Sequence, residues 1–181
     1  TQDYAYATYI ISMWVWLSSA YAIVSIMKYV HGNIGVDIIC KYVIIICLAQ
    51  CILAQIIDVS PLAKYWYVRL FGKPEGLEAV NRLYGIGASL DTAGIRFSIA
   101  LIMAPYLAIR CKDVKKQVFY VISWAIITIL GSMVARTTYV GCVAGLIYMV
   151  IASDLWRLRL KTSMSKLVGV MVLAIIIMIP I

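Results

Sequence analysis

The sequence predicts an all-α fold, a polytopic bundle of about six transmembrane helices with short amphipathic helices in one outer loop. Three observations lead to this prediction. The chain is 64% hydrophobic and 13% charged, whereas soluble domains are typically about 45–50% apolar and about 25% charged. Apolar runs long enough to cross a hydrocarbon core of about 30 Å recur along it. No long polar stretch remains to build a second core, so residues 1–181 are predicted to form a single membrane domain.

The predicted spans follow the apolar runs. Residues 6–30 and 36–57 are each long enough to cross a bilayer, and aromatic side chains crowd the first half of the first run, as at a membrane–water interface. The remaining predicted spans are residues 94–109, 116–130, 137–153 and an apolar run from Leu167 onward. Because this last run is still apolar at Ile181, we expect the chain to be part of a larger protein.

Residues 58–92 form the one substantial segment predicted to lie outside the hydrocarbon. Ser60 followed by Pro61 predicts a helix start, since a capping hydroxyl and a proline in the first turn both favour one. The apolar residues that follow recur on one helix face: Leu62, Trp66 and Leu70. Gly72 is predicted to end this helix, and a second short helix is predicted within residues 77–84.

We expect both short helices to lie on the membrane surface. Three consecutive aromatic residues, Tyr65, Trp66 and Tyr67, are predicted at headgroup depth.

The distribution of charge predicts which loops face the cytoplasm. The net charge is +8, but in a membrane chain a positive excess reflects topology, so we expect no nucleic-acid partner. Residues 28–41, 110–116 and 153–166 together hold ten basic residues against three acids, whereas the opposite side holds six against five. The positive-inside rule places the first set in the cytoplasm. Residues 58–92 and Arg136 are therefore predicted to face outward.

The cysteines and the single histidine give no sign of catalysis or metal binding. The chain has five cysteines: Cys40, Cys47, Cys51, Cys111 and Cys142. They form no CxxC pair, and four of them sit in or beside apolar runs. We expect them to pack as small core residues. A stripe of Cys47, Cys51 and Gln55 is predicted to face another span, and His31 is predicted to lie in a solvated loop.

A single arginine interrupts the apolar sequence between the fourth and fifth predicted spans. Gly131 is predicted to end one helix and Ser132 to cap the next, which places Arg136 near a helix N-terminus. Two interpretations remain open. Arg136 binds a phosphate together with the helix dipole, or it snorkels to the lipid headgroups at the tip of a helical hairpin.

A second arginine is predicted at the same level. Residues 85–94 form a small-residue turn leading into a helix that Ser89 or Asp91 can cap. The short span that follows, residues 94–109, predicts that Arg96 lies within the membrane interface, level with Arg136.

This order of features resembles the O-antigen ligase and polysaccharide polymerase family of bacterial envelope proteins. Members carry a Gly-rich outer turn, similar to residues 87–94, then a basic cytoplasmic turn, then a hydrophobic hairpin with a small-Ser-Arg-small motif at its outer tip. Residues 131–141 match that motif in part, since Ala135 stands where the family usually has serine and Thr137 where it often has glycine.

The resemblance implies a metal-independent glycosyltransferase in the bacterial inner membrane, with no cofactor. Its partners would be membrane lipids and a polyprenyl-diphosphate-linked glycan, and its catalytic groups would come from a large outer loop beyond Ile181. Guanidinium groups would bind the donor phosphates: Arg136, Arg96, Arg82 and Arg69. Supporting roles would fall to Ser132, Thr137 and Asp91. The alternative is a non-catalytic polytopic transporter or scaffold, in which Arg136 marks a helix tip or a permeation path.

Overall fold

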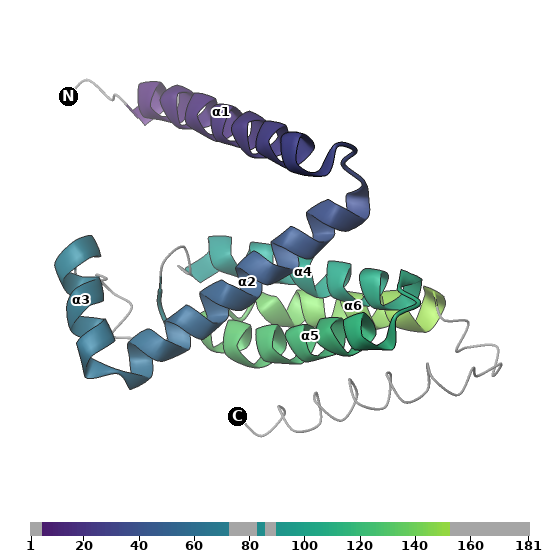
Figure 1. Cartoon of the computed structure of the whole chain (residues 1–181). Coiled ribbons are helices and arrows are strands. Elements are labelled where there is room, and N and C mark those ends of the chain that lie inside the picture. Colours follow the sequence, from purple (N-terminus) through teal and green to yellow (C-terminus); the bar gives the residue numbers. More distant parts are fainter. Residues whose placement is uncertain (1–4, 73–82, 86–89, 153–181) are drawn as a thin grey trace. The chain divides into compact units, whose positions relative to one another are not determined.

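The computed structural model describes residues 5–72, 83–85 and 90–152, and these residues form helices and no strand. The helices are shown in Figure 1: α1 (Ala5–His31), α2 (Val36–Val59), α3 (Pro61–Phe71), α4 (Leu90–Arg110), α5 (Val114–Val134) and α6 (Thr138–Ala152). The all-α prediction is therefore confirmed for this part of the chain.

Four of these helices, α1, α2, α4 and α5, are long and apolar enough to cross a membrane, and α6 is a shorter apolar helix. This supports a membrane protein, and the predicted count of about six spans stays a prediction. Two helices are longer than predicted, because α4 begins at Leu90 instead of residue 94 and α5 continues to Val134 instead of residue 130. The predicted sixth span, from Leu167, lies outside the described residues, as does most of the predicted helix at 77–84.

The break between α2 and α3 follows the predicted signals. Ser60 is extended, and its hydroxyl accepts a hydrogen bond from the Ala63 N–H over 3.4 Å, with Pro61 in the first turn. At the other end Gly72 has a φ of 84°, which favours glycine, and its N–H bonds the Val68 carbonyl over 3.0 Å. The predicted helix over residues 61–71 is confirmed.

The chain divides into two compact units, residues 1–39 and 40–181. In the first, α1 is apolar around its whole circumference, and its side chains from Thr8 onward remain exposed or half-buried. Such a helix is suited to lipid on every side. His31 is its last residue.

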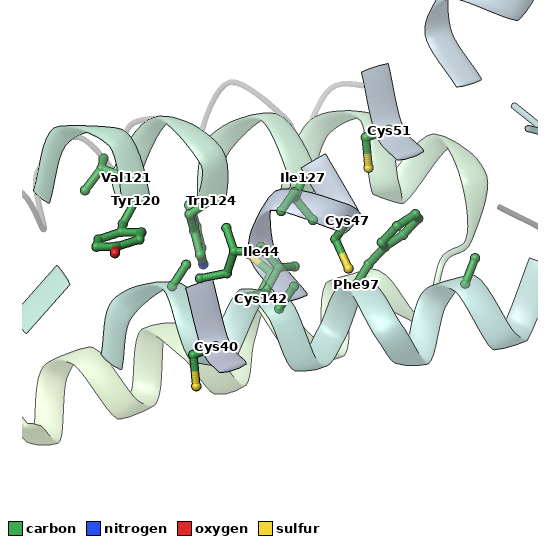
Figure 2. Close-up of a cluster of buried hydrophobic side chains, with 14 of the residues drawn as sticks. Cys40, Ile44, Cys47, Cys51, Phe97, Tyr120, Val121, Trp124, Ile127 and Cys142 are labelled. Atoms are coloured by element: carbon green, nitrogen blue, oxygen red, sulfur yellow. The ribbon is translucent and has the colours of Figure 1, made fainter. Parts of the chain in front are cut away.

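In the second unit, α4 packs against both α5 and α6. The two largest fully buried side chains of this unit are aromatic, Trp124 of α5 and Phe97 of α4, and neither exposes any surface. One face of α2 contributes five buried residues to the same core, Ala54 and the four labelled in Figure 2: Cys40, Ile44, Cys47 and Cys51. Because lipid is as apolar as these side chains, close packing rather than removal from water holds such a core together.

The predicted role of the cysteines is largely confirmed. All five are free thiols, and Cys40, Cys47, Cys51 and Cys142 are buried, whereas Cys111 is half-buried. Among the described residues no group of His, Cys, Asp and Glu is arranged to hold a metal ion. The cysteines therefore act as small packing residues.

Two glycines four residues apart bring α6 against the backbone of α4. A Cβ added at Gly145 would lie 2.5 Å from the carbonyl oxygen of Leu101, and one added at Gly141 would strike the backbone of Ser98. This Gly-x-x-x-Gly spacing lets membrane helices approach closely. Sequence analysis missed its role here, although the spacing itself was a readable signal.

Candidate functional site

The candidate site surrounds the turn at residues 135–137, between α5 and α6. Two groups bond the carbonyl of Gly131 here, the N–H of Ala135 over 2.9 Å and the buried hydroxyl of Thr138 over 3.0 Å. The N–H groups of Thr138, Tyr139 and Val140 bond back to the carbonyls of residues 135, 136 and 137, each over 3.1 Å. These three N–H groups at the start of α6 are therefore already bonded to nearby carbonyls and are not open to a ligand.

The predicted helix break at Gly131 is wrong. Gly131 is buried inside α5, where an added Cβ would lie 3.1 Å from both Phe97 and Thr138. Ser132 does not cap α6, because its hydroxyl donates to the Ile129 carbonyl within α5 over 2.8 Å. The lack of a side chain at Gly131 allows close packing at this position. Helix α5 continues past it to Val134, and the Thr138 hydroxyl bonds the Gly131 carbonyl.

The turn is held against the first half of α4. Ser98 donates a hydrogen bond to the carbonyl of Thr137 over 2.9 Å. A Cβ added at Gly94 would lie 2.9 Å from the Cβ of Ala135 and would strike the Thr137 hydroxyl. The absence of a side chain at Gly94 therefore lets the turn lie directly on α4.

Arg136 occupies the middle of this turn and is exposed. Within the described part of the chain, its guanidinium has no hydrogen-bond or ion-pair partner, and the backbone N–H groups of Arg136 and Thr137 bond no carbonyl. The Arg136 guanidinium and the consecutive N–H groups of residues 136 and 137 are therefore donors with no acceptor in the described part of the chain. Such a set is suited to an anion.

Arg96 lies at the same end of the second unit but on another side of α4. It is the seventh residue of α4 rather than a residue of the first turn, because the helix begins four residues earlier than predicted. Its Nε donates to the Thr92 carbonyl over 3.2 Å, and its own carbonyl accepts a weak bond from the Cys47 thiol at 3.8 Å. Arg96 is two residues from Gly94 and two from Ser98, and residues so spaced do not share a helix face.

The other predicted site residues are spread over this end of the chain. Arg69 lies on α3, where its guanidinium is 5.5 Å from the centre of the Trp66 ring. Asp91 is the second residue of α4, and Arg82 lies outside the described residues. Among the predicted site residues, Thr137 is the one that the structure places in the same turn as Arg136.

Sequence analysis missed an aromatic contact that ties α3 to this end. The rings of Tyr67 and Tyr84 lie 5.4 Å apart, and Lys64 lies 5.8 Å from the Tyr84 ring centre. Burial raises the pKa of the Tyr67 phenol, and Tyr84 raises it further, so this ring stays neutral. Leu83, the residue before Tyr84, connects this region to α5, because its N–H donates to the Met133 carbonyl over 3.3 Å.

The end of α2 closes the same region. An added Cβ on Gly85 would lie 3.2 Å from Ala54 of α2, so residues 83–85 bridge α2, α3 and the last turn of α5. We call this whole region the turn end: residues 83–85 and 135–137, α3 and the first half of α4.

The turn end can bind an anion, but its described residues include no pair suited to nucleophilic catalysis. The single histidine of the chain, His31, belongs to the other compact unit. Comparison of the chain with models of protein families, with curated proteins and with solved structures finds no match. The chemistry of the turn end is therefore the basis for assigning a function.

Proposed function

We propose that the turn end binds the diphosphate of a polyprenyl-linked glycan and that the chain belongs to an O-antigen ligase or polysaccharide polymerase of the bacterial inner membrane. The observation that carries this proposal is the donor set of Arg136. Its guanidinium and the N–H groups of residues 136 and 137 have no acceptor within the described chain. An exposed cation at the end of a membrane helix pair meets lipid-borne phosphate as its nearest anion.

The location favours a lipid-linked substrate over a soluble one. Arg136 lies two residues after the end of α5, an apolar helix of 21 residues, and two residues before the apolar helix α6. At 1.5 Å per residue, α5 is about 31 Å long, close to the thickness of a hydrocarbon core. The Arg136 guanidinium thus lies where the polar head of a polyprenyl lipid meets the bilayer. In the full arrangement we propose six spans, with the turn end on the outer face.

The reaction would be an inverting glycosyl transfer. The bond between the anomeric carbon and the diphosphate oxygen breaks, and a bond forms between that carbon and an acceptor hydroxyl, whose proton passes to a base or to water. The leaving polyprenyl diphosphate gains negative charge, which Arg136 stabilises through paired hydrogen bonds. Arg96 would approach the same diphosphate from the other side of α4, with Arg69 and Arg82 assisting.

A transporter or scaffold is the second candidate. The exposure of Arg136 supports it as much as it supports the glycosyltransferase. A snorkelling arginine also lies exposed at a helix tip and needs no protein partner. The two candidates differ in what they require of a lipid. Only the glycosyltransferase needs to recognise the diphosphate.

The test is binding of polyprenyl diphosphate to the chain in lipid nanodiscs. We expect Arg136→Ala to lose most of the affinity, because the guanidinium supplies the charged donors of the set. Arg110→Ala is the matched control, since Arg110 is exposed at the opposite end of α4, where it donates to the Tyr106 hydroxyl over 2.9 Å. Equal affinity of wild type and Arg136→Ala would favour the transporter or scaffold.

A further inference from the structure

Helix α3 starts at a membrane boundary. One residue, Ser60, separates it from α2, which is apolar and long enough to span a bilayer. The 11 residues of α3 extend about 16 Å, which is too short to cross the hydrocarbon. A short helix that follows a span so closely has to lie near the surface where that span ends.

The contact between Tyr67 and Tyr84 determines which side of α3 faces the protein. Tyr67 also packs on Phe71, with ring centres 5.3 Å apart, and the neighbouring Val68 is half-buried. Leu62, Trp66 and Leu70 form a stripe at four-residue spacing that runs beside Tyr67, with 68%, 49% and 69% of their surfaces exposed. The second unit therefore leaves this apolar stripe exposed.

The charges of α3 complement an anionic surface. The helix carries Lys64 and Arg69 and no acidic residue. Arg69 is exposed, and its guanidinium lies over the ring of Trp66. The exposed leucines match the acyl chains of a bilayer, the Trp66 ring matches its interface, and the Arg69 guanidinium matches its phosphates.

We propose that Leu62, Trp66, Arg69 and Leu70 form a docking surface for anionic phospholipid. The leucines and the indole enter the boundary between headgroups and acyl chains by about 5–10 Å, and Arg69 binds lipid phosphate. The Tyr67 ring packs against Tyr84, so it contacts the protein on one side, and its headgroup depth stays a prediction. This docking shares Arg69 with the proposed diphosphate site but requires no diphosphate donor.

The contacts of α3 transmit this docking to the turn end. Tyr84 contacts Tyr67, and Leu83 bonds the Met133 carbonyl at the end of α5, three residues before Arg136. A docked α3 therefore fixes the turn end at the level of the lipid headgroups.

The experiment places a nitroxide label at Leu62→Cys, Leu70→Cys or, as the matched control, Lys64→Cys. Lys64 lies on the other side of α3, over the Tyr84 ring. The full chain carries Cys111→Ser as background, because the four other cysteines are buried. The protein is reconstituted in vesicles of phosphatidylethanolamine and phosphatidylglycerol, and collisions with oxygen and with a water-soluble nickel complex are measured by electron paramagnetic resonance.

We expect labels at 62 and 70 to collide more often with oxygen than with the nickel complex, and the label at 64 to show the reverse. Replacing phosphatidylglycerol by phosphatidylcholine should make the labels at 62 and 70 shallower, and Arg69→Gln should abolish that lipid dependence. Tyr67→Ala should reduce the difference between the two faces. Equal water accessibility at positions 62, 64 and 70 would overturn the proposal. Spin–spin broadening between labels of two copies would overturn it too, since a second copy would then cover the face.

Discussion

The hydroxyl of Ser98 on α4 donates a hydrogen bond to the Thr137 carbonyl over 2.9 Å and ties the turn that carries Arg136 to the helix that carries Arg96. Gly94, one helical turn earlier, leaves room for the same turn to lie on α4. The position of the Arg136 guanidinium thus depends on two small residues of another helix. This relationship leads to the first prediction.

Replacing Ser98 by alanine should destabilise the packing of the turn on α4. Interhelical hydrogen bonds in membrane proteins contribute about 0.6 kcal/mol on average, and we expect a loss of about that size in the free energy of unfolding. Denaturant unfolding in detergent micelles would measure it. Ser12→Ala is the matched control, because Ser12 is exposed on α1. A Ser98→Ala variant as stable as this control would contradict the role given to the bond.

Replacing Gly145 by alanine should cost more than the loss of the Ser98 bond. The new Cβ would lie 2.5 Å from the Leu101 carbonyl oxygen, so α6 has to move away from α4. Overpacking of this kind typically costs about 1–3 kcal/mol. Gly35→Ala is the control, since a Cβ there meets nothing within 4 Å. A thermal melt should show a lower midpoint for Gly145→Ala and an unchanged one for Gly35→Ala. Equal midpoints would argue against close contact of α4 with α6.

The two ends of α5 should lie on opposite sides of the membrane. Lys115 is its second residue, and Arg136 follows its last residue by two. We expect Lys115→Cys and Arg136→Cys, each in the Cys111→Ser background, to react with a membrane-impermeant maleimide from opposite sides of sealed vesicles. From the positive-inside rule we predict that Lys115 is the position labelled from the cytoplasmic side. Labelling of both positions from one side would refute the arrangement of spans.

Local signals predicted the helix ends that depend on neighbouring residues alone. Ser60, Pro61 and Gly72 define α3 because a capping hydroxyl, a fixed φ and a positive φ act within one turn of the backbone. Composition likewise predicted the apolar helices, since each has to satisfy its own backbone groups in lipid.

The end of α5 could not be predicted in the same way. Gly131 and Ser132 have strong capping propensity, but tertiary packing decides their conformation. Gly131 contacts Phe97 of α4, which lies 34 residues earlier, and its carbonyl is satisfied by Thr138. Hydropathy likewise cannot predict the position of Arg96 within its helix, because α4 extends into the preceding polar residues Asp91 and Thr92.

The proposed diphosphate site depends most directly on Arg136 acting as a bidentate phosphate ligand. Affinity for polyprenyl diphosphate in nanodiscs, measured for wild type and Arg136→Lys, tests this, because lysine keeps the charge and loses the planar fork of donors. Hydrogen bonds to charged groups contribute about 1.5–3 kcal/mol, so we predict that Arg136→Lys weakens binding by about tenfold or more. Affinity unchanged by lysine would show that charge alone suffices, as for a snorkelling arginine, and would contradict the phosphate-binding role of Arg136.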